Sequence, residues 1–350
     1  MLLRSETVAQ HAASSLRTAP RLTTLLLLGS LLTLTGCESL GVALGLRTRL
    51  DHLPVTGITL ALSPAGAVSP GGSAALVIVA RTADGKSLAT VGAGGGKVLF
   101  DSFSFETQLL EVNAKGKVSL PQDPRTTDAH TPHLHVTVVG HPEVSADLEV
   151  PLRYDVPFVA SFSGHSGRFG TDGMNGMDGT AGMLGSTDPN SPLAGGNGSS
   201  GSNGGDGSDG GPGEPGQSVH VWMTLRAGAR PLLEVRAMSA AREQFFLIDP
   251  AGGSLSVEAN GGAGGRGGSG GRGGRGGAGG TGSPDGLPGG DGLNGSDGRT
   301  GPPGAAGVIE AVIDPQARPY VDRLRLVNHD GAGRPGPTPQ VQFLPVPPLW

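Results

Sequence analysis

The amino-acid sequence predicts an all-β protein with an N-terminal β-sandwich and a second, smaller β module that carries two antiparallel glycine-triplet hairpins. Short apolar runs between proline and glycine turn signals predict the strands. Glycine at every third position in four blocks predicts the hairpins. With 64 glycines among 350 residues and only 4% aromatic residues, the composition is far from ordinary globular usage. The glycine blocks therefore need a structural explanation of their own.

The first 36 residues have the pattern of a bacterial export signal. Basic residues precede an apolar run of about 15 residues, which is shorter than the roughly 20 residues that a membrane-spanning helix needs. The run ends at Leu34, Thr35, Gly36 and Cys37. These four residues resemble the lipobox of bacterial lipoproteins, where small residues precede the cleaved bond. The resemblance implies removal of residues 1–36, lipid on Cys37 and a tether over residues 37–53.

The lipobox resemblance also implies an address. We expect an exported protein that is anchored to a lipid membrane through acylated Cys37, with the outer membrane favoured and either the cell surface or the periplasm as its location. An ordinary secretory signal with a chance cysteine is the alternative. Cys37 is the only cysteine, so no intrachain disulfide can hold the fold together.

Residues 54–157 are expected to form the sandwich, because short strand-like runs alternate there with turn signals. The apolar runs are 55–62, 74–80, 98–100, 108–112, 134–139 and 146–152. The order of a first strand, a Pro-Gly-Gly turn, a second apolar strand and an Asp-Gly-Lys turn resembles bacterial Ig-like domains of surface proteins. The tyrosine and tryptophan landmarks of antibody domains are missing, so the resemblance concerns architecture.

The four glycine blocks span residues 164–185, 195–216, 261–282 and 286–307, and each has eight glycines in register. Proline-containing turns at 188–192 and 283–285 join them in two pairs of equal length. Equal halves around a turn predict two antiparallel hairpins, the arms 164–217 and 261–307. At about 3.1 Å per residue, eight full triplets (24 residues) would span about 75 Å, and the 22 residues from the first to the last glycine of a block about 70 Å.

Three arrangements suit such blocks. A collagen-like trimer fits the period of three, but the first and third blocks have almost no proline to stiffen it. Disordered glycine-rich arms fit the composition. A polyglycine-II bundle, in which neighbouring threefold helices exchange backbone hydrogen bonds, fits the strict register and the paired lengths. The blocks resemble the glycine bundles of snow-flea antifreeze proteins and phage tail-fibre tips, although their irregular, charged outer positions disfavour an antifreeze role.

Counting bare faces predicts where each block lies in the bundle. The third block is mostly Gly-Gly-X, and the second is partly so, which predicts interior positions; the first and fourth carry larger residues and suit outer positions. Folding the second hairpin at Pro284 predicts ion pairs between Arg275 and Asp291 and between Arg272 and Asp297, which set register more than stability.

The second β module is expected over residues 158–327. Its strand-like runs are 158–162, 218–225, 232–238, 244–248, 254–258, 308–313 and 321–327. The first arm then bridges 158–162 and 218–225, and the second is inserted between 254–258 and 308–313. Residues 328–350 form a proline-rich tail in which 341–344 suits an edge strand or a lid.

No catalytic centre emerges from the sequence. His133 and His135 would share one face of a strand and are the candidate metal ligands, but no cysteine or glutamate is placed to complete a set. Residues 204–209 lack the apolar position of calcium-binding nonapeptides. The glycine blocks contain no Walker lysine, and no Ser/His/Asp combination has a triad context. A net charge of −5 is modest and argues neither for nucleic acid nor for a strongly anionic surface as a partner, so no nucleic-acid partner is expected. No cofactor is expected.

Two function classes follow. The first is a non-enzymatic surface lipoprotein with a structural or adhesive display role, in which a stiff bundle projects from the envelope. The alternative is a carbohydrate- or protein-binding module of the cell envelope, with an envelope or extracellular protein or a glycan as partner. An enzyme is the least favoured class.

Overall fold

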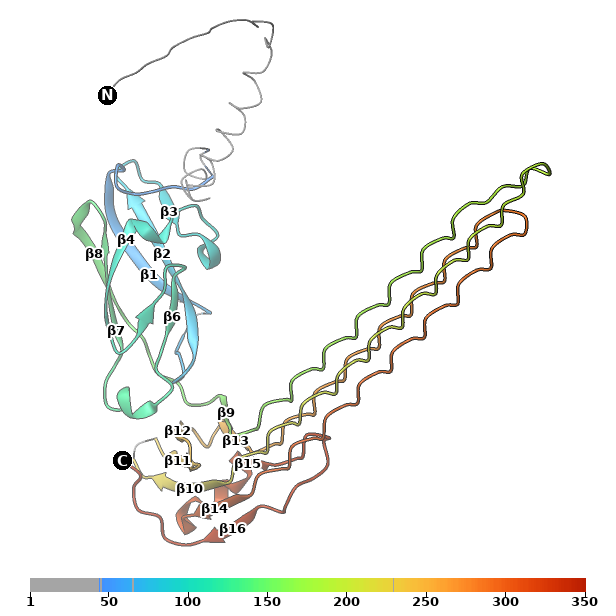
Figure 1. The fold of residues 1–350 in the computed structure, drawn as a ribbon. Coiled ribbons are helices and arrows are strands. Elements are labelled where there is room, and N and C mark those ends of the chain that lie inside the picture. Colours follow the sequence, from blue (N-terminus) through green and yellow to red (C-terminus); the bar gives the residue numbers. More distant parts are fainter. Residues whose placement is uncertain (1–43, 45, 65, 229) are drawn as a thin grey trace, which may run out of the picture. The chain divides into compact units, whose positions relative to one another are not determined.

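The computed structural model describes residues 44–350 apart from 45, 65 and 229, and the fold is all-β, as the sequence predicts (Figure 1). Strands account for 33% of the residues and helix for 6%. Within the described part of the chain, no helix is long and apolar enough to cross a membrane. The export signal, Leu34, Thr35, Gly36 and Cys37 lie outside the described residues.

The chain divides into two compact units that are interleaved along the sequence. The first comprises the described residues up to 66, residues 74–118 and residues 133–149. The second comprises residues 67–73, 119–132 and 150–350. Two loops of the region expected to form the sandwich, 67–73 and 119–132, therefore cluster with the second unit, as does 150–157.

The first unit is built from two antiparallel sheets. One has the order β1-β2-β6-β5, with β3 also paired to β2, and the other has the order β4-β7-β8. The strands are β1 (Val55–Ser63), β2 (Ser73–Thr82), β3 (Ser87–Ala89), β4 (Phe103–Gln108), β5 (Glu111–Val112), β6 (Lys117–Ser119), β7 (His133–Val138) and β8 (His141–Glu149). Short 3-10 turns lie at Gly92–Gly94 and Phe100–Ser102. Alternation along β2 and β7 buries Ile78 and Val136 completely.

The second unit pairs a five-stranded sheet with a three-stranded sheet around one apolar core. The five-stranded sheet has the order β12-β11-β10-β14-β16 and the other the order β15-β13-β9. The strands are β9 (Pro157–Ser161), β10 (Val219–Arg226), β11 (Leu232–Met238), β12 (Glu243–Ile248), β13 (Ser254–Glu258), β14 (Ile309–Ile313), β15 (Leu324–Val327) and β16 (Gln340–Phe343). 3-10 turns lie at Pro124–Thr126 and Pro315–Arg323. Phe162, Met223 and Leu255 are fully buried in the core.

The glycine arms are insertions between strands of the two sheets, as predicted. The first arm leaves β9 and returns into β10, and the second leaves β13 and returns into β14. Strands β9 and β13 pair in parallel in one sheet, and β10 and β14 pair in parallel in the other. Both arms therefore leave one sheet from the same end of neighbouring strands and enter the other sheet at the same end of neighbouring strands. The predicted edge strand of the C-terminal tail is β16, which pairs in parallel with β14.

Candidate functional site: the glycine bundle

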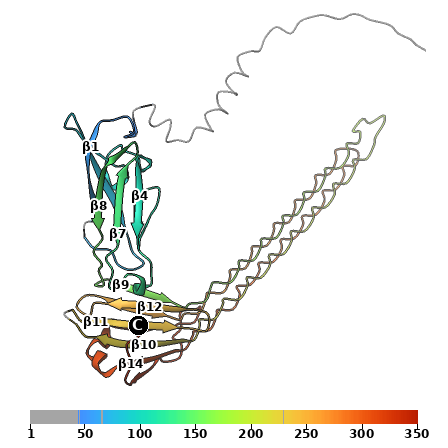
Figure 2. The same ribbon diagram turned by 90° about the vertical axis from the view of Figure 1, so that its left-hand side faces the viewer.

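The four glycine blocks run side by side as a bundle of extended helices (Figures 1 and 2). We call them helix I (164–185), helix II (195–216), helix III (261–282) and helix IV (286–307). Their backbones exchange hydrogen bonds of 2.7 to 2.9 Å between nitrogen and oxygen at each triplet. The structure therefore has the predicted polyglycine-II bundle, formed within one chain, rather than a collagen-like trimer or disordered arms.

The hydrogen bonds place helices II and III in the middle of the bundle. The N–H groups of helix I bond to helix III, those of helix II to helices I and IV, those of helix III to helix II, and those of helix IV to helix III. No backbone bond joins helices I and IV, both of which are fully described. The cross-section is a rhombus whose short diagonal is formed by helices II and III. The interior and outer positions predicted from the bare faces are confirmed.

The close approach of the helices explains why the period of three is strict. A Cβ atom added to Gly170 would lie 2.1 Å from the carbonyl oxygen of Ser208, and one added to Gly265 would lie 1.9 Å from that of Arg168. Such distances exclude any side chain. Helix III has glycine at two of every three positions because the first glycine of each triplet approaches carbonyl oxygens of helix IV and the second approaches those of helix I. The second glycine of each triplet is buried, as at Gly265 and Gly268.

The parallel sheet pairs set the register of the bundle. Ser161 of β9 lies opposite Glu258 of β13, and Val219 of β10 lies opposite Ile309 of β14. The same two offsets, 97 and 90 residues, recur along the arms: Asp172 faces Ser269 at 97, and Asp206 faces Ser296 at 90. The sheets at the base therefore align helix I with helix III and helix II with helix IV.

Short polar side chains accept hydrogen bonds from those backbone N–H groups that have no backbone acceptor on a neighbouring helix. On helix I, the side-chain oxygens of Asp172, Asn175 and Asp178 accept hydrogen bonds of 2.7 to 2.9 Å from backbone N–H groups of helix III. These carboxylates and amides thus act as side-chain acceptors for backbone N–H groups of the neighbouring helix.

The same device recurs on the other helices. The Oδ1 atoms of helix II accept from helix IV, those of helix IV accept from helix III, and serine hydroxyls of helix II accept from helix I. The helix II acceptors are Asn197, Asn203, Asp206 and Asp209. The helix IV acceptors are Asp291, Asn294 and Asp297. The serines are Ser199, Ser202 and Ser208.

At one step of the bundle, a pair of prolines removes an acceptor and its donor together. Where helix II would place the next acceptor, it has Pro212, whose neighbour on helix IV at the 90-residue offset is Pro302. Proline has no backbone N–H, so Pro302 needs no acceptor. Acceptor and donor are thus missing together at this step.

The ion pairs expected within the second arm do not form. Asp291 accepts from the backbone nitrogen of Gly276 and Asp297 from that of Gly270, both at 2.7 to 2.8 Å. Among the fully described arms, no ion pair joins Arg272 or Arg275 to a carboxylate. The prediction was wrong because these carboxylates accept hydrogen bonds from backbone N–H groups of the neighbouring helix. At Asp206, the hydrogen bond from the backbone of Ser296 holds the carboxyl pKa below its usual value.

Large apolar side chains are exposed along the bundle, at Phe169, Met174, Met177 and Leu293, and four more lie near its distal end. Met183, Leu184, Leu193 and Leu287 are 63 to 85% exposed. All four lie next to the turns that close the two arms: Leu193 accepts hydrogen bonds from Ser186 and Ser283 through its carbonyl oxygen. Exposed apolar residues collected in one place indicate an interaction surface.

The two histidines that were the weak metal-ligand candidates lie together in the first unit. His133 and His135 on β7 both face Asp147 on β8: His133 Nε2 lies 3.1 Å, and His135 Nδ1 2.8 Å, from the same carboxylate oxygen. The hydrogen bond from His135 lowers the pKa of Asp147. Within the part of the chain that the structure describes, no group of three His, Cys, Asp or Glu side chains is placed to hold a metal ion.

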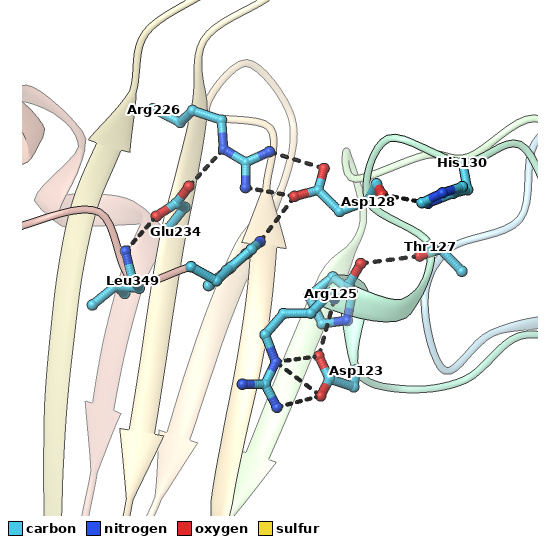
Figure 3. Close-up of polar contacts among 10 residues, drawn as sticks. Asp123, Arg125, Thr127, Asp128, His130, Arg226, Glu234 and Leu349 are labelled. Atoms are coloured by element: carbon cyan, nitrogen blue, oxygen red, sulfur yellow. Dashed lines mark hydrogen bonds and ion pairs between the residues drawn. The ribbon is translucent and has the colours of Figure 1, made fainter.

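A polar cluster in the second unit was not anticipated from sequence (Figure 3). The Arg226 guanidinium donates to both oxygens of Asp128, at 2.9 and 2.7 Å, and to buried Glu234 at 2.5 Å. Asp128 also accepts from Trp350 Nε1 at 2.8 Å, and Glu234 from the backbone nitrogen of Leu349. Arg226 lowers the pKa of Asp128. Partners up to 222 residues apart leave no local pattern that sequence reasoning can find.

Comparison with protein-family models, with curated proteins and with solved structures finds no match to this chain. Its function must therefore be argued from its own residues.

Proposed function

We propose that the chain is a lipid-anchored surface protein of the bacterial envelope with a non-enzymatic structural or adhesive display role. One observation carries the proposal: within a single chain, the glycine faces of the bundle pack against one another and most of its backbone N–H groups find acceptors. Such an element needs no partner to be ordered, so it suits a stiff projection better than an assembly domain. The lipobox resemblance at Cys37 supplies the anchor, with the outer membrane favoured.

The distal apolar residues support the adhesive form of this role. A projection about 70 Å long, from 22 residues at about 3.1 Å each, presents Met183, Leu184, Leu193 and Leu287 at the end away from the β module. Apolar groups of this kind on a stiff support lose little conformational freedom when a partner binds. The contacted partner would be an envelope or extracellular protein, or a glycan with apolar faces.

Surface display can be tested with a single thiol. Because the acylated Cys37 is the only cysteine, Asn190→Cys in the distal turn introduces one reactive thiol, and the natural chain is the unlabelled control. We expect a membrane-impermeant maleimide to label the variant on intact cells. Labelling that requires cell lysis would overturn surface display.

The anchor is tested separately by metabolic labelling with an alkyne-bearing palmitate. The natural chain should incorporate the label and remain with the membrane fraction. Cys37→Ser should lose both properties, whereas the neighbouring Ser39→Ala should keep them. Equal incorporation by the natural chain and Cys37→Ser would exclude acylation at this residue.

A second candidate function, a carbohydrate-binding module, is favoured by one face of the five-stranded sheet. A recess of about 120 Å³ is lined there by His220, Trp222, Glu310, Gln340 and Gln342, among others. His220 Nδ1 lies 3.2 Å from a carboxylate oxygen of Glu310. An aromatic ring beside carboxamides suits a neutral, hydroxyl-rich ligand. The recess is far smaller than the roughly 300–1,000 Å³ of pockets that enclose small molecules, so one residue of a polysaccharide fits it better.

Affinity electrophoresis in gels containing neutral polysaccharides, such as dextran, galactomannan or β-glucan, tests this second function. Retardation of the natural chain should be lost in Trp222→Ala and Gln342→Ala. It should persist in Gln316→Ala, which removes an exposed glutamine outside the recess. A natural chain that none of these gels retards would exclude the carbohydrate-binding role.

A further inference from the structure

The first unit contains a cleft that neither proposed function uses. It lies between residue 47, the segment that connects β3 to β4, and the turn before β6, and its volume is about 510 Å³. This volume falls within the roughly 300–1,000 Å³ that small-molecule sites occupy. The cleft lies entirely within the first unit.

Aromatic and aliphatic side chains form the wall of the cleft. Phe100 and Phe103 are 5% exposed, Phe105 and Val91 are half-buried, and Leu99 is buried beneath them. Within the described part of the chain, Val91 and Phe105 leave part of their apolar surface open to the cleft, and a ligand with an apolar body would remove that surface from water.

One glycine holds this wall in position. Gly116 has φ +74°, and a Cβ atom added to it would lie 2.0 Å from Cζ of Phe100. The Phe100 ring therefore packs directly on the backbone of the turn. Its position is fixed without a ligand, so the cleft is already formed in the free protein.

The rim of the cleft is positively charged. Arg47 and Lys115 line it and are exposed. Asp101, the acidic residue of the lining, already pairs with Arg49 at 2.6 Å. Among the residues that the structure describes, neither Arg47 nor Lys115 has an acidic partner within 4.0 Å. Two cations thus remain uncompensated beside an apolar wall.

We propose that this cleft is a binding site for an amphipathic anion, a molecule with an alkyl or aromatic body and a carboxylate-like head. The body contacts Phe105 and Val91, and the head lies between Arg47 and Lys115. Charged hydrogen bonds to the head fix its orientation, while apolar burial supplies affinity. The site depends neither on the lipid anchor nor on the glycine bundle, so its test is independent of the display role.

Isothermal titration calorimetry with two probes of equal chain length tests the site. Decanoate should bind saturably with one site per chain, and decyltrimethylammonium, which carries the opposite charge, should bind at least tenfold more weakly. The Arg47→Ala, Lys115→Ala double variant should lose about tenfold in affinity for decanoate. Arg81→Ala, which removes an exposed cation of the same unit outside the cleft, should bind as the natural chain does.

Val91→Asp gives a second arm that leaves the aromatic wall intact. The new carboxylate should abolish decanoate binding and strengthen the binding of decyltrimethylammonium. An unchanged melting temperature is the check on folding. Equal binding of both probes by the natural chain, absence of saturable decanoate binding, or full affinity in the double variant would each overturn the proposal.

Discussion

The side chain of Asp172 accepts a hydrogen bond of 2.7 Å from the backbone nitrogen of Ser269, which follows it by 97 residues. Ser161 and Glu258, partners in the parallel sheet at the base of the arms, are separated by the same number of residues. The register of helices I and III is therefore an extension of a β-sheet register. The bundle does not have to find its alignment, because the two sheets impose it where the arms begin.

Two adjacent glycines of helix IV should respond in opposite ways to alanine. At Gly289 an added Cβ would lie 2.0 Å from the carbonyl oxygen of Ser199, whereas at Gly290 the nearest atom, Ser200 Oγ, lies at 3.8 Å. We expect Gly289→Ala to destabilise the bundle by about 1–3 kcal/mol or more. Gly290→Ala should be neutral or stabilising by roughly 0.4–1 kcal/mol, since it restricts the unfolded chain. Thermal unfolding of both variants measures the difference; equal melting temperatures would contradict the packing argument.

Replacement of Asp206 should separate its role as an acceptor from its charge. Asp206→Asn keeps an oxygen opposite the Ser296 nitrogen, while Asp206→Ala removes it. Amide hydrogen exchange at Ser296 should accelerate strongly in the alanine variant and little in the asparagine variant. Comparable acceleration in both would mean that charge, not the hydrogen bond, protects this amide.

The lowered pKa of Asp206 also predicts how the stability of the protein depends on pH. Because the folded carboxyl has a pKa below its unfolded value of about 3.9, its stabilising effect is complete above that value and is lost as pH falls through the folded pKa. The natural chain should therefore lose stability relative to Asp206→Asn between about pH 5 and pH 2. Melting temperatures across that range test the sign, and a constant difference would contradict it.

The paired prolines of the bundle should be replaceable together by a donor and an acceptor. Pro302→Leu introduces a backbone N–H opposite Pro212, and Pro212→Asn introduces an acceptor, as in the observed pair Asn203 and Leu293. In a double-mutant cycle we expect a favourable coupling of about 0.5–1.5 kcal/mol. A coupling indistinguishable from zero would show that the side-chain acceptors do not stabilise the bundle.

The cluster around Arg226 should contribute to the stability of the second unit. Asp128→Asn leaves Arg226 with one carboxylate, that of Glu234, and we expect a loss of about 1–3 kcal/mol in the free energy of unfolding. Because Arg226 lowers the pKa of Asp128, this contribution is present above about pH 4 and is lost on acidification. Denaturant unfolding at pH 7 and pH 3 measures both effects. The matched control is Asp322→Asn, which alters an exposed carboxylate outside the cluster.

The sequence was sufficient for the parts of the fold that obey a local period. Triplet glycines defined the four blocks, and the number of bare faces per triplet placed helix III in the interior, because each neighbouring helix requires one face without Cβ atoms. The parallel alignment of helices I and III was not accessible in this way. It depends on β9 pairing with β13, a contact between strands that lie about a hundred residues apart in the chain.

The wrong ion pairs have a physical explanation of the same kind. The fold at Pro284 and the opposite charges predicted a pair between Arg275 and Asp291, whereas in the structure the Asp291 carboxylate accepts a hydrogen bond from the backbone nitrogen of Gly276. A buried or half-buried N–H without an acceptor costs more than an exposed ion pair contributes. The cluster of Asp128, Arg226 and Trp350 was missed because its members come from segments with no common motif.

The constant offsets between arms restrict how this protein can change over generations. Insertion of one triplet into a single helix would displace every later acceptor from its donor and leave one arm longer than its neighbours. A change of length preserves the bundle only when all four helices gain or lose the same triplet. The length of the bundle therefore changes in steps of about 9 Å, three residues at about 3.1 Å each, and a single-residue insertion or deletion within it breaks the hydrogen-bond register.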